Sequence, residues 1–135
     1  MRLVDANVFI YAVGRSDLYR DPCRQILDAA ANHLIDVNTD IEVFQDILHH
    51  FQVRCDTYRG TQTVREAMVV FPDALTITSV IMGLATDILL AHPHLQSRDA
   101  VHAAVVLEHR LEGIISADRA FDGIHGVRRF DPRDI

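Results

Sequence analysis

The chain has 135 residues, enough for one domain with its own core, and its apolar fraction of 49% and charged fraction of 24% exclude a disordered chain. The formal net charge of −6 excludes nucleic-acid binding by overall electrostatic attraction, although a local cationic surface remains compatible with it. All 13 basic residues are arginine, which excludes any mechanism that needs a catalytic or phosphate-binding lysine.

The first elements alternate between strand and helix patterns. Residues 2–5 form a short apolar strand pattern that ends in an acid, and a short helix is predicted around residues 8–11. Asp21 followed by Pro22 predicts an N-cap and the first position of a helix that continues to about residue 32. A second short strand is predicted at residues 34–37.

The next helix has a capping-box pattern, with Thr39 as the N-cap and Glu42 as the third helical residue. Apolar residues then recur at steps of three and four, which predicts a buried face formed by Ile41, Phe44, Leu48, Phe51 and Cys55. A break at residues 58–61 separates this helix from another that ends before Pro72.

The second half of the chain continues the alternation. Residues 75–78 fit either a short strand or an extended lead into a helix at residues 79–91, and Ser97 is predicted to cap the following helix. Gly113 ends that helix, a strand follows at residues 114–116, and residues 127–130 fit an edge strand. The alternation predicts one α/β domain over residues 1–135, a three-layer α/β/α sandwich around a short parallel sheet.

Four acids occupy equivalent places in these elements. Asp5 ends the first strand, Asp118 follows the strand at residues 114–116, and Glu42 and Asp99 lie in the first turns of helices. The carboxyl ends of parallel strands and the N-termini of the helices that follow face the same edge of a sheet, so all four acids are expected to surround one crevice.

Such a cluster of like charges is costly unless a cation neutralises it. Ligands that are all oxygen favour Mg²⁺, with Mn²⁺ as a substitute, over zinc. A cation in that position activates water and neutralises a phosphodiester, so hydrolysis of a phosphate ester is the reaction that this arrangement serves best.

Three segments carry these acids in a recognisable form: LVDANVFI at residues 3–10, RDAVHAA at residues 98–104 and ISADRAFD at residues 115–122. They closely resemble the acidic motifs of PIN-domain ribonucleases, above all those of VapC toxins from toxin–antitoxin pairs. The resemblance extends in order along the whole chain, to the terminal segment at residues 129–132.

The resemblance implies a Mg²⁺-dependent endoribonuclease that cleaves structured RNA such as tRNA or rRNA. It also implies a homodimer that a VapB-like antitoxin silences in a heterotetramer or a larger complex. Asp5, Asp99 and Asp118 match the family's metal-binding acids, Asn7 and Ser116 match supporting positions, and Asp122 fits a further acid found in some members.

The acid of the second motif has two candidates. Related toxins often have two glutamates where this chain has Glu42 and Asp46, which lie four residues apart on one helical face. The spacing from Asp5 favours Glu42, whereas the apolar residues that flank the acid favour Asp46. Glu42 is preferred, with Asp46 as the alternative catalytic and metal-binding acid.

Arginines and histidines suggest secondary roles. Arg98 and Arg119 flank two of the acids, and we hypothesise that they bind RNA phosphates beside the metal, unless they pair with Asp99 and Asp118 instead. The helical histidines 49, 50 and 102 are interpreted as partly buried polar residues, with substrate contact as the alternative.

Other functions and other compartments fit the sequence less well. A phosphotransferase that forms an aspartyl phosphate needs a lysine, which is absent, so the remaining alternative is a PIN-like module that binds RNA or protein without catalysis.

The apolar runs are too short for a membrane span and the N-terminus is unlike a signal peptide, so a cytoplasmic location is expected. Cys23 and Cys55 are accordingly expected to be reduced and partly buried.

Overall fold

The computed structural model describes residues 1–15 and 17–135, and its centre is a sheet of four short parallel strands. In sequence order the strands are β1 (Arg2–Val4), β2 (Val37–Asn38), β3 (Ile114–Ile115) and β4 (Arg129–Phe130). Their order across the sheet is β2-β1-β3-β4, which places the N-terminal strand between two neighbours. The predicted parallel sheet is confirmed, including a short edge strand at β4.

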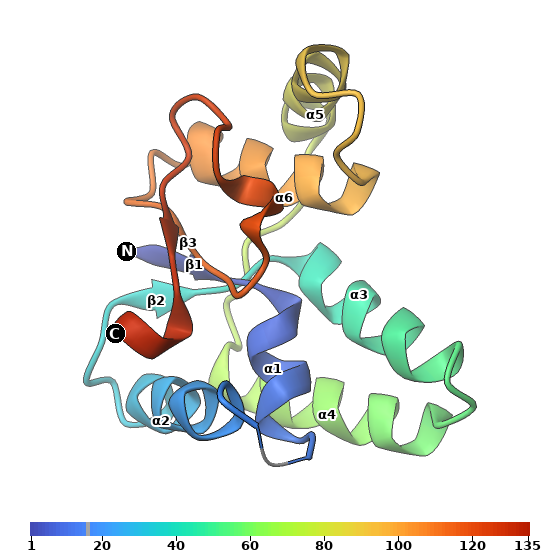
Figure 1. Cartoon of the computed structure of the whole chain (residues 1–135), viewed down its shortest axis with the longest axis vertical. Coiled ribbons are helices and arrows are strands. Elements are labelled where there is room, and N and C mark those ends of the chain that lie inside the picture. Colours follow the sequence, from blue (N-terminus) through green and yellow to red (C-terminus); the bar gives the residue numbers. More distant parts are fainter. Residues whose placement is uncertain (16) are drawn as a thin grey trace.

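The sheet separates two apolar clusters, because alternate residues of a strand point to opposite faces. Leu3 and Ile114 belong to one cluster, and their neighbours Val4 and Ile115 belong to the other. Figure 1 shows the resulting layers, with α5 and α6 on one side of the strands and α1, α2 and α4 on the other. The α/β/α sandwich predicted from the alternation of elements is therefore confirmed.

In the described part of the chain, six α-helices build the outer layers: α1 (Ala6–Ala12), α2 (Arg20–Ala31), α3 (Ile41–Gln52), α4 (Thr57–Val70), α5 (Ser79–Ala91) and α6 (Ser97–Glu108). Two short 3₁₀ helices, η1 (Arg119–Phe121) and η2 (Pro132–Asp134), flank β4 in the sequence. α1 follows β1 with only Asp5 between them, so that residue both ends a strand and begins a helix.

The boundary between α3 and α4 differs from the prediction. The helices are separated at residues 53–56 and not at 58–61, because the Asp56 carboxylate accepts a hydrogen bond from the Arg59 amide and begins α4 there. Cys55 lies in this turn with a φ of 57°, and its side chain is exposed rather than on the buried face of α3. Cys23, in α2, is buried.

Other predicted caps are also displaced. α2 begins at Arg20, one residue before the predicted cap Asp21, because Asp17 accepts hydrogen bonds from the amides of Tyr19 and Arg20. α6 begins at Ser97 itself, after Gln96, which provides no side-chain cap. The second strand is β2, at Val37–Asn38 rather than at residues 34–37, because the Leu34 amide donates to the Ala29 carbonyl at the end of α2 and the Leu34 side chain is exposed.

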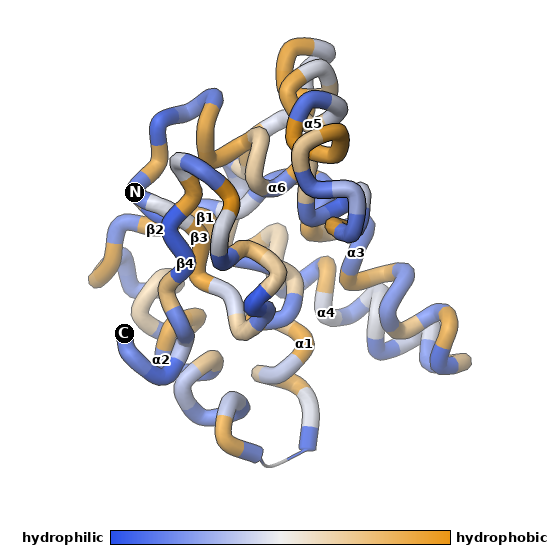
Figure 2. Tube along the Cα trace, turned by 45° about the horizontal axis from the view of Figure 1, so that its top comes forward, coloured by the Kyte–Doolittle hydropathy of each residue, from blue (hydrophilic) through white to orange (hydrophobic). Residues whose placement is uncertain are grey.

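The segment before α5 is an extended lead and not a strand, with a single parallel bridge between Leu75 and Asp40. α5 packs mainly on α6 through Ile81 and Ala85, and Figure 2 shows that hydrophobic residues also occupy its outer turns. Within the described part of the chain, no helix combines the length and the apolar character that crossing a membrane requires.

Candidate active site

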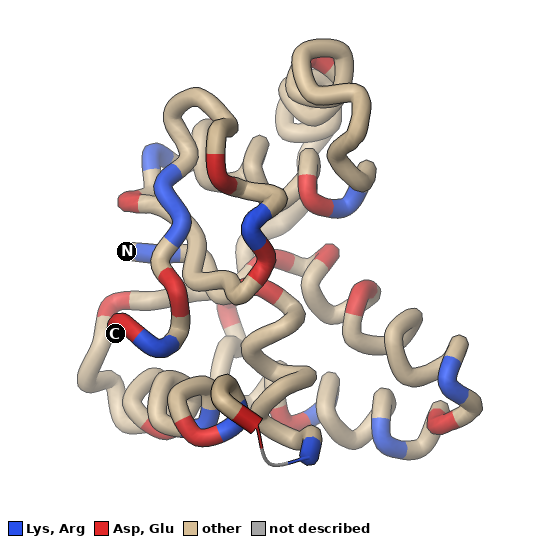
Figure 3. The backbone as a smooth tube through the Cα atoms, in the orientation of Figure 1, with Lys and Arg blue, Asp and Glu red and all other residues tan. Residues whose placement is uncertain are grey.

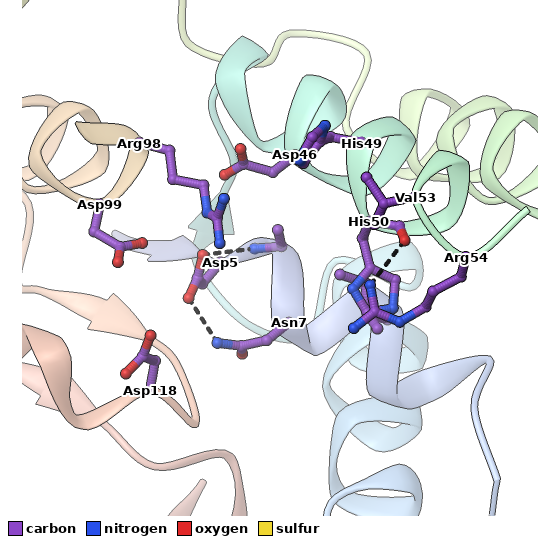
Figure 4. A pocket seen from close by; sticks show the side chains of 12 residues that line it. Asp5, Asn7, Asp46, His49, His50, Val53, Arg54, Arg98, Asp99 and Asp118 are labelled. Carbon is purple, nitrogen blue, oxygen red and sulfur yellow. Dashed lines mark hydrogen bonds between the residues drawn. The ribbon is translucent and has the colours of Figure 1, made fainter. Parts of the chain in front are cut away.

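Four carboxylates surround a pocket of about 300 Å³ at the carboxyl ends of the strands. Asp5 and Asp118 come from segments that follow β1 and β3, Asp99 from the first turn of α6, and Asp46 from the middle of α3. Figure 4 shows these four side chains around one opening, and Figure 3 shows the same gathering of acidic segments in the whole molecule. Three of the four acids preferred from the sequence are thus brought together, and Asp46 is present where Glu42 was expected.

Asp5 is held on both of its carboxylate oxygens. Oδ1 accepts a hydrogen bond of 2.7 Å from the Ala6 amide, which makes Asp5 the N-cap of α1. Oδ2 accepts hydrogen bonds from Asn7 Nδ2 at 2.7 Å and from the Ser116 hydroxyl. Burial nevertheless raises the pKa of Asp5, although the charge of His102 and the hydrogen bond from Ser116 act in the opposite direction. Because burial makes the ionised form of Asp5 unfavourable, a cation bound to this carboxylate would stabilise it.

Asn7 and Ser116 link the two strand ends to each other. Asn7 Nδ2 donates to Ser116 Oγ at 2.8 Å, and Asn7 Oδ1 accepts from the Ala117 amide at 3.2 Å. Ser116 Oγ also accepts from the Asp118 amide at 3.0 Å. The two residues therefore fix Asp5 relative to the turn that carries Asp118, the arrangement on which their predicted supporting role depends.

Asp99 is 8% exposed, and the pKa of its carboxyl group is raised. Burial, followed by the charges of Asp5 and Asp118, raises the pKa of Asp99 to about 6. Asp118 is more open to solvent and caps η1 through a hydrogen bond of 2.9 Å from the Ala120 amide. Asp5 and Asp99 thus form the buried part of the cluster and Asp118 its exposed rim.

The second motif is organised by a buried histidine. His102 of α6 is fully buried, with Nδ1 at 2.8 Å from Asp40 Oδ2 and Nε2 at 2.7 Å from Asp46 Oδ2. Burial alone would lower the pKa of His102, but the charge of Asp40 and the hydrogen bonds with Asp40 and Asp46 raise it well above the usual value. An imidazolium donates from both nitrogens, which matches two carboxylate partners.

Asp40, and not Thr39, is the N-cap of α3. Its Oδ1 accepts from the Val43 amide at 2.9 Å, whereas the Thr39 hydroxyl donates to the Val4 carbonyl at 2.8 Å and ties β2 to β1. The predicted capping box is therefore wrong, and Glu42 is the second helical residue. Glu42 is half-buried and lies outside the pocket lining, whereas the Asp46 side chain is 9% exposed and lines the pocket.

Comparisons with known proteins agree with this architecture. The PIN domain family model matches residues 2–126. Ribonuclease VapC13 of Mycobacterium tuberculosis is 33% identical over 130 residues, which are 96% of this chain and 98% of the relative. Ribonuclease VapC7 of the same organism is 31% identical, over 94% of this chain and 88% of the relative. The chain belongs to the PIN-domain family, in its VapC branch.

Solved structures support the same fold for this PIN domain. The crystal structure of FitAcB from Neisseria gonorrhoeae superposes with a TM-score of 0.74 at 15% identity and full coverage of both chains. A toxin–antitoxin complex from Klebsiella pneumoniae gives a TM-score of 0.67 at 19% identity, again over both full chains. These likenesses concern the fold, since the identities are low.

The remaining sequence candidates divide between the pocket and its surroundings. Arg98 lines the pocket, and neither Arg98 nor Arg119 forms an ion pair within residues 1–15 and 17–135. Arg119 is exposed and outside the lining. Asp122 pairs with Arg129, Nε to Oδ1 at 2.8 Å, and also lies outside the lining. The structure therefore brings Arg98 to the acids, but neither Arg119 nor Asp122.

Three further polar residues line the pocket from the second half of α3 and the turn after it: His49, His50 and Arg54. From the sequence, substrate contact was only the alternative interpretation of the two histidines, and Arg54 was not a candidate. The two histidines follow Asp46 at steps of three and four residues, so they share one helical face with it, whereas Arg54 lies in the turn after α3. That spacing was visible in the sequence, but only the assignment of Asp46 to the pocket makes it informative.

The donor set of this PIN domain fits a hard divalent cation. Among residues 1–15 and 17–135, no three acidic, histidine or cysteine side chains are already grouped as a metal site requires. Mg²⁺ needs only one or two carboxylates and keeps several waters, so a tight preformed cage is not the expected geometry. The buried and mutually repelling Asp5 and Asp99, whose pKa values are both raised, are the pair that would gain most from a cation.

Replacing Asp99 by Asn is expected to stabilise the metal-free protein near pH 7. The folded-state pKa of about 6 exceeds the ordinary value of 3.8, so ionised Asp99 destabilises the fold above pH 6, and this cost disappears as the pH falls towards 4. Asp99→Asn should therefore add on the order of 1–3 kcal/mol to the free energy of unfolding at pH 7 in chelator, and little at pH 4.

Urea unfolding at the two pH values measures this difference. The exposed Asp87 of α5 provides the control, because Asp87→Asn makes the same change of charge away from the pocket. Equal stability of Asp99→Asn and the wild type at pH 7 would show that Asp99 has no electrostatic cost in the metal-free fold.

Proposed function

We propose that this PIN domain is a metal-dependent endoribonuclease toxin that cleaves structured RNA, such as tRNA or rRNA, in the cytoplasm. The observation that carries the proposal is the convergence of Asp5, Asp99, Asp118 and Asp46 on one pocket, in a member of a family whose relatives are named ribonucleases. In this proposal Asp5 and Asp99 hold Mg²⁺ or Mn²⁺, with Asp118 and Asp46 as further oxygen donors.

The chain's own residues set the orientation of these donors. Ser116 and Asn7 fix Asp5 through its Oδ2, so the geometry of Asp5 is determined before any ligand binds. His102 binds one oxygen of Asp46 and leaves the other oxygen available. A bound divalent cation would supply an activated water and neutralise charge on the phosphodiester. Arg98, beside Asp99 and without an ion-pair partner in the described residues, is suited to bind an RNA phosphate next to the carboxylates.

Cleavage is expected to require the metal. The purified protein should cleave a mixture of tRNA and rRNA in Mg²⁺ or Mn²⁺, lose that activity in excess EDTA and recover it when Mg²⁺ is restored. Denaturing gels of labelled RNA measure the effect, and cleavage that persists in chelator would refute the metal-dependent mechanism. RNA binding without cleavage in any metal would instead favour the alternative, a PIN-like binding module.

Asp46, rather than Glu42, is proposed as the acid of the second motif. Asp46→Asn is expected to lower kcat by about 10²-fold, because it removes a charge that faces the pocket, whereas Glu42→Gln should leave kcat within about twofold. The two substitutions remove equal charge from the same helical face, so each is the control for the other. A larger loss in Glu42→Gln would restore the assignment first made from the sequence.

The proposal includes a VapB-like antitoxin and a homodimer, which together would form a heterotetramer or a larger complex. Support comes from the toxin–antitoxin complex that shares this fold and from the acidic pocket, into which a partner arginine would fit in place of the metal. A complex that takes up Mn²⁺ as readily as the free protein does would contradict this mode of inhibition.

A further inference from the structure

The pocket is lined by positive charge as well as by carboxylates. Of the arginines in this acidic chain, Arg2, Arg20, Arg59, Arg129 and Arg133 are bound to carboxylates. Arg54 and Arg98 both line the pocket, and within residues 1–15 and 17–135 neither forms an ion pair. Two guanidinium groups that form no ion pair in the described residues and line one pocket are suited to bind an anion.

Arg54 is separated from the carboxylates by the second half of α3, whereas Arg98, on α6, lies next to them. Asp46, His49 and His50 line the pocket from α3, and Val53 and Arg54 line it from the turn after the helix ends at Gln52. The six-residue step from Asp46 to Gln52 covers about 9 Å of helix. A nucleic-acid strand carries one phosphate per ~3.4 Å of axis in a duplex, so this distance accommodates more than one phosphate. Figure 4 shows Asp46 towards the acids, with His50 farther along the helix and Arg54 after its end.

His50 lies near both of these arginines. Arg54 Nη1 donates to the His50 carbonyl at 2.9 Å, which fixes the guanidinium beside the histidine at the last turn of α3. Burial, and then the charges of Arg54 and Arg98, lower the pKa of His50, so both guanidinium groups act on the same point of the pocket. A neutral imidazole between two guanidinium groups can donate a hydrogen bond without adding a third charge.

We propose that Arg54, His50 and Arg98 form a second subsite, which binds the RNA phosphate adjacent to the one that is cleaved. This subsite rests on the proposed ribonuclease function, because it extends the same pocket along the substrate. In this arrangement the acids take the cation at the scissile phosphate, and the guanidinium groups take the uncompensated neighbouring phosphate.

RNA binding by an Arg54→Gln variant tests the subsite. Fluorescence anisotropy of labelled tRNA in EDTA separates binding from cleavage, at 50, 100 and 200 mM salt. We expect Arg54→Gln to raise the Kd about 5–20-fold and to reduce the slope of log K against log salt by about 0.7–0.9, the value for one lost phosphate contact. Arg98→Gln is expected to give a similar result.

The matched control is Arg110→Gln, which makes the same charge change at an exposed arginine beyond the opposite end of α6 from Arg98. Equal Kd and equal salt slope for Arg54→Gln and Arg110→Gln would overturn the subsite. An unchanged Kd for RNA, together with weaker binding of an acidic peptide, would assign Arg54 to a protein partner and also overturn it.

Turnover kinetics distinguish this inference from the proposed function. If the wild type cleaves RNA, Arg54→Gln should raise KM about 5–20-fold and leave kcat within about twofold, because the contact is present before and during reaction. A cleaving wild type with an unaltered Arg54→Gln variant would refute the subsite alone. Loss of RNA affinity in Arg54→Gln, in a protein that never cleaves, would refute the ribonuclease but keep the phosphate site.

Discussion

The Asp5→Asn variant is expected to lose RNA cleavage by about 10³-fold or more and to lose the thermal stabilisation by Mn²⁺. Asp5 is the buried acid at the centre of the cluster, and removal of its charge removes a cation ligand that no neighbour replaces. A loss of about 10³-fold corresponds to roughly 4 kcal/mol of transition-state stabilisation. Cleavage rates and the melting temperature with and without Mn²⁺ measure the two effects.

The structure also predicts a side effect on folding. Asn remains a good N-cap, so the hydrogen bond from the Ala6 amide can persist. An amide NH₂ in place of Oδ2 would face the donors of Asn7 and Ser116, at a cost of about 1–3 kcal/mol. The activity comparison is therefore made well below the melting temperature of the variant. A folded Asp5→Asn protein that cleaves at the wild-type rate would eliminate Asp5 as a metal ligand.

Replacement of His102 by Phe is expected to cause the largest loss of stability, about 3–5 kcal/mol, or roughly 10–20 °C in Tm. The substitution leaves the carboxylates of Asp40 and Asp46 buried without their shared partner. His125 is exposed on the loop before β4, so His125→Phe is the control and should change stability by less than about 0.5 kcal/mol.

The contribution of His102 should depend on pH. Its folded-state pKa is raised, so its stabilisation is complete below the unfolded value of 6.5 and declines as the pH rises through the folded-state pKa. Urea unfolding of the wild type and of His102→Phe, at pH 6 and in steps towards alkaline pH, measures the difference. A gap in stability that widens with increasing pH would contradict a protonated His102.

Local patterns in the sequence were sufficient for the sheet and for three of the acids. Asp5 follows an apolar strand directly, and the parallel arrangement then determines which edge of the sheet it faces. Asp99 and Asp118 follow from the same rule, because each is adjacent to an element whose type is clear. Their exposure and charge state, in contrast, depend on packing that no local pattern describes.

The second motif could not be resolved locally, because its deciding partner lies 56 residues from Asp46 in the sequence. Thr39 and Asp40 are both good capping residues, and which of them caps α3 depends on the Val4 carbonyl and on His102. Because Asp40 and not Thr39 is the cap, Glu42 is the second helical residue and not the third. The acid of α3 that lines the pocket is Asp46 and not Glu42. Helix propensity and periodicity contain no information on either partner.

The position of β3 between β1 and β4 determines when during synthesis the pocket can exist. Ser116, which holds Asp5, and Asp118 are made more than a hundred residues after Asp5. At about 5–20 residues per second, this interval lasts many seconds. A nascent chain therefore has no complete pocket until residues 116–118 have been made, so a cell that makes the proposed toxin has that time to supply its inhibitor.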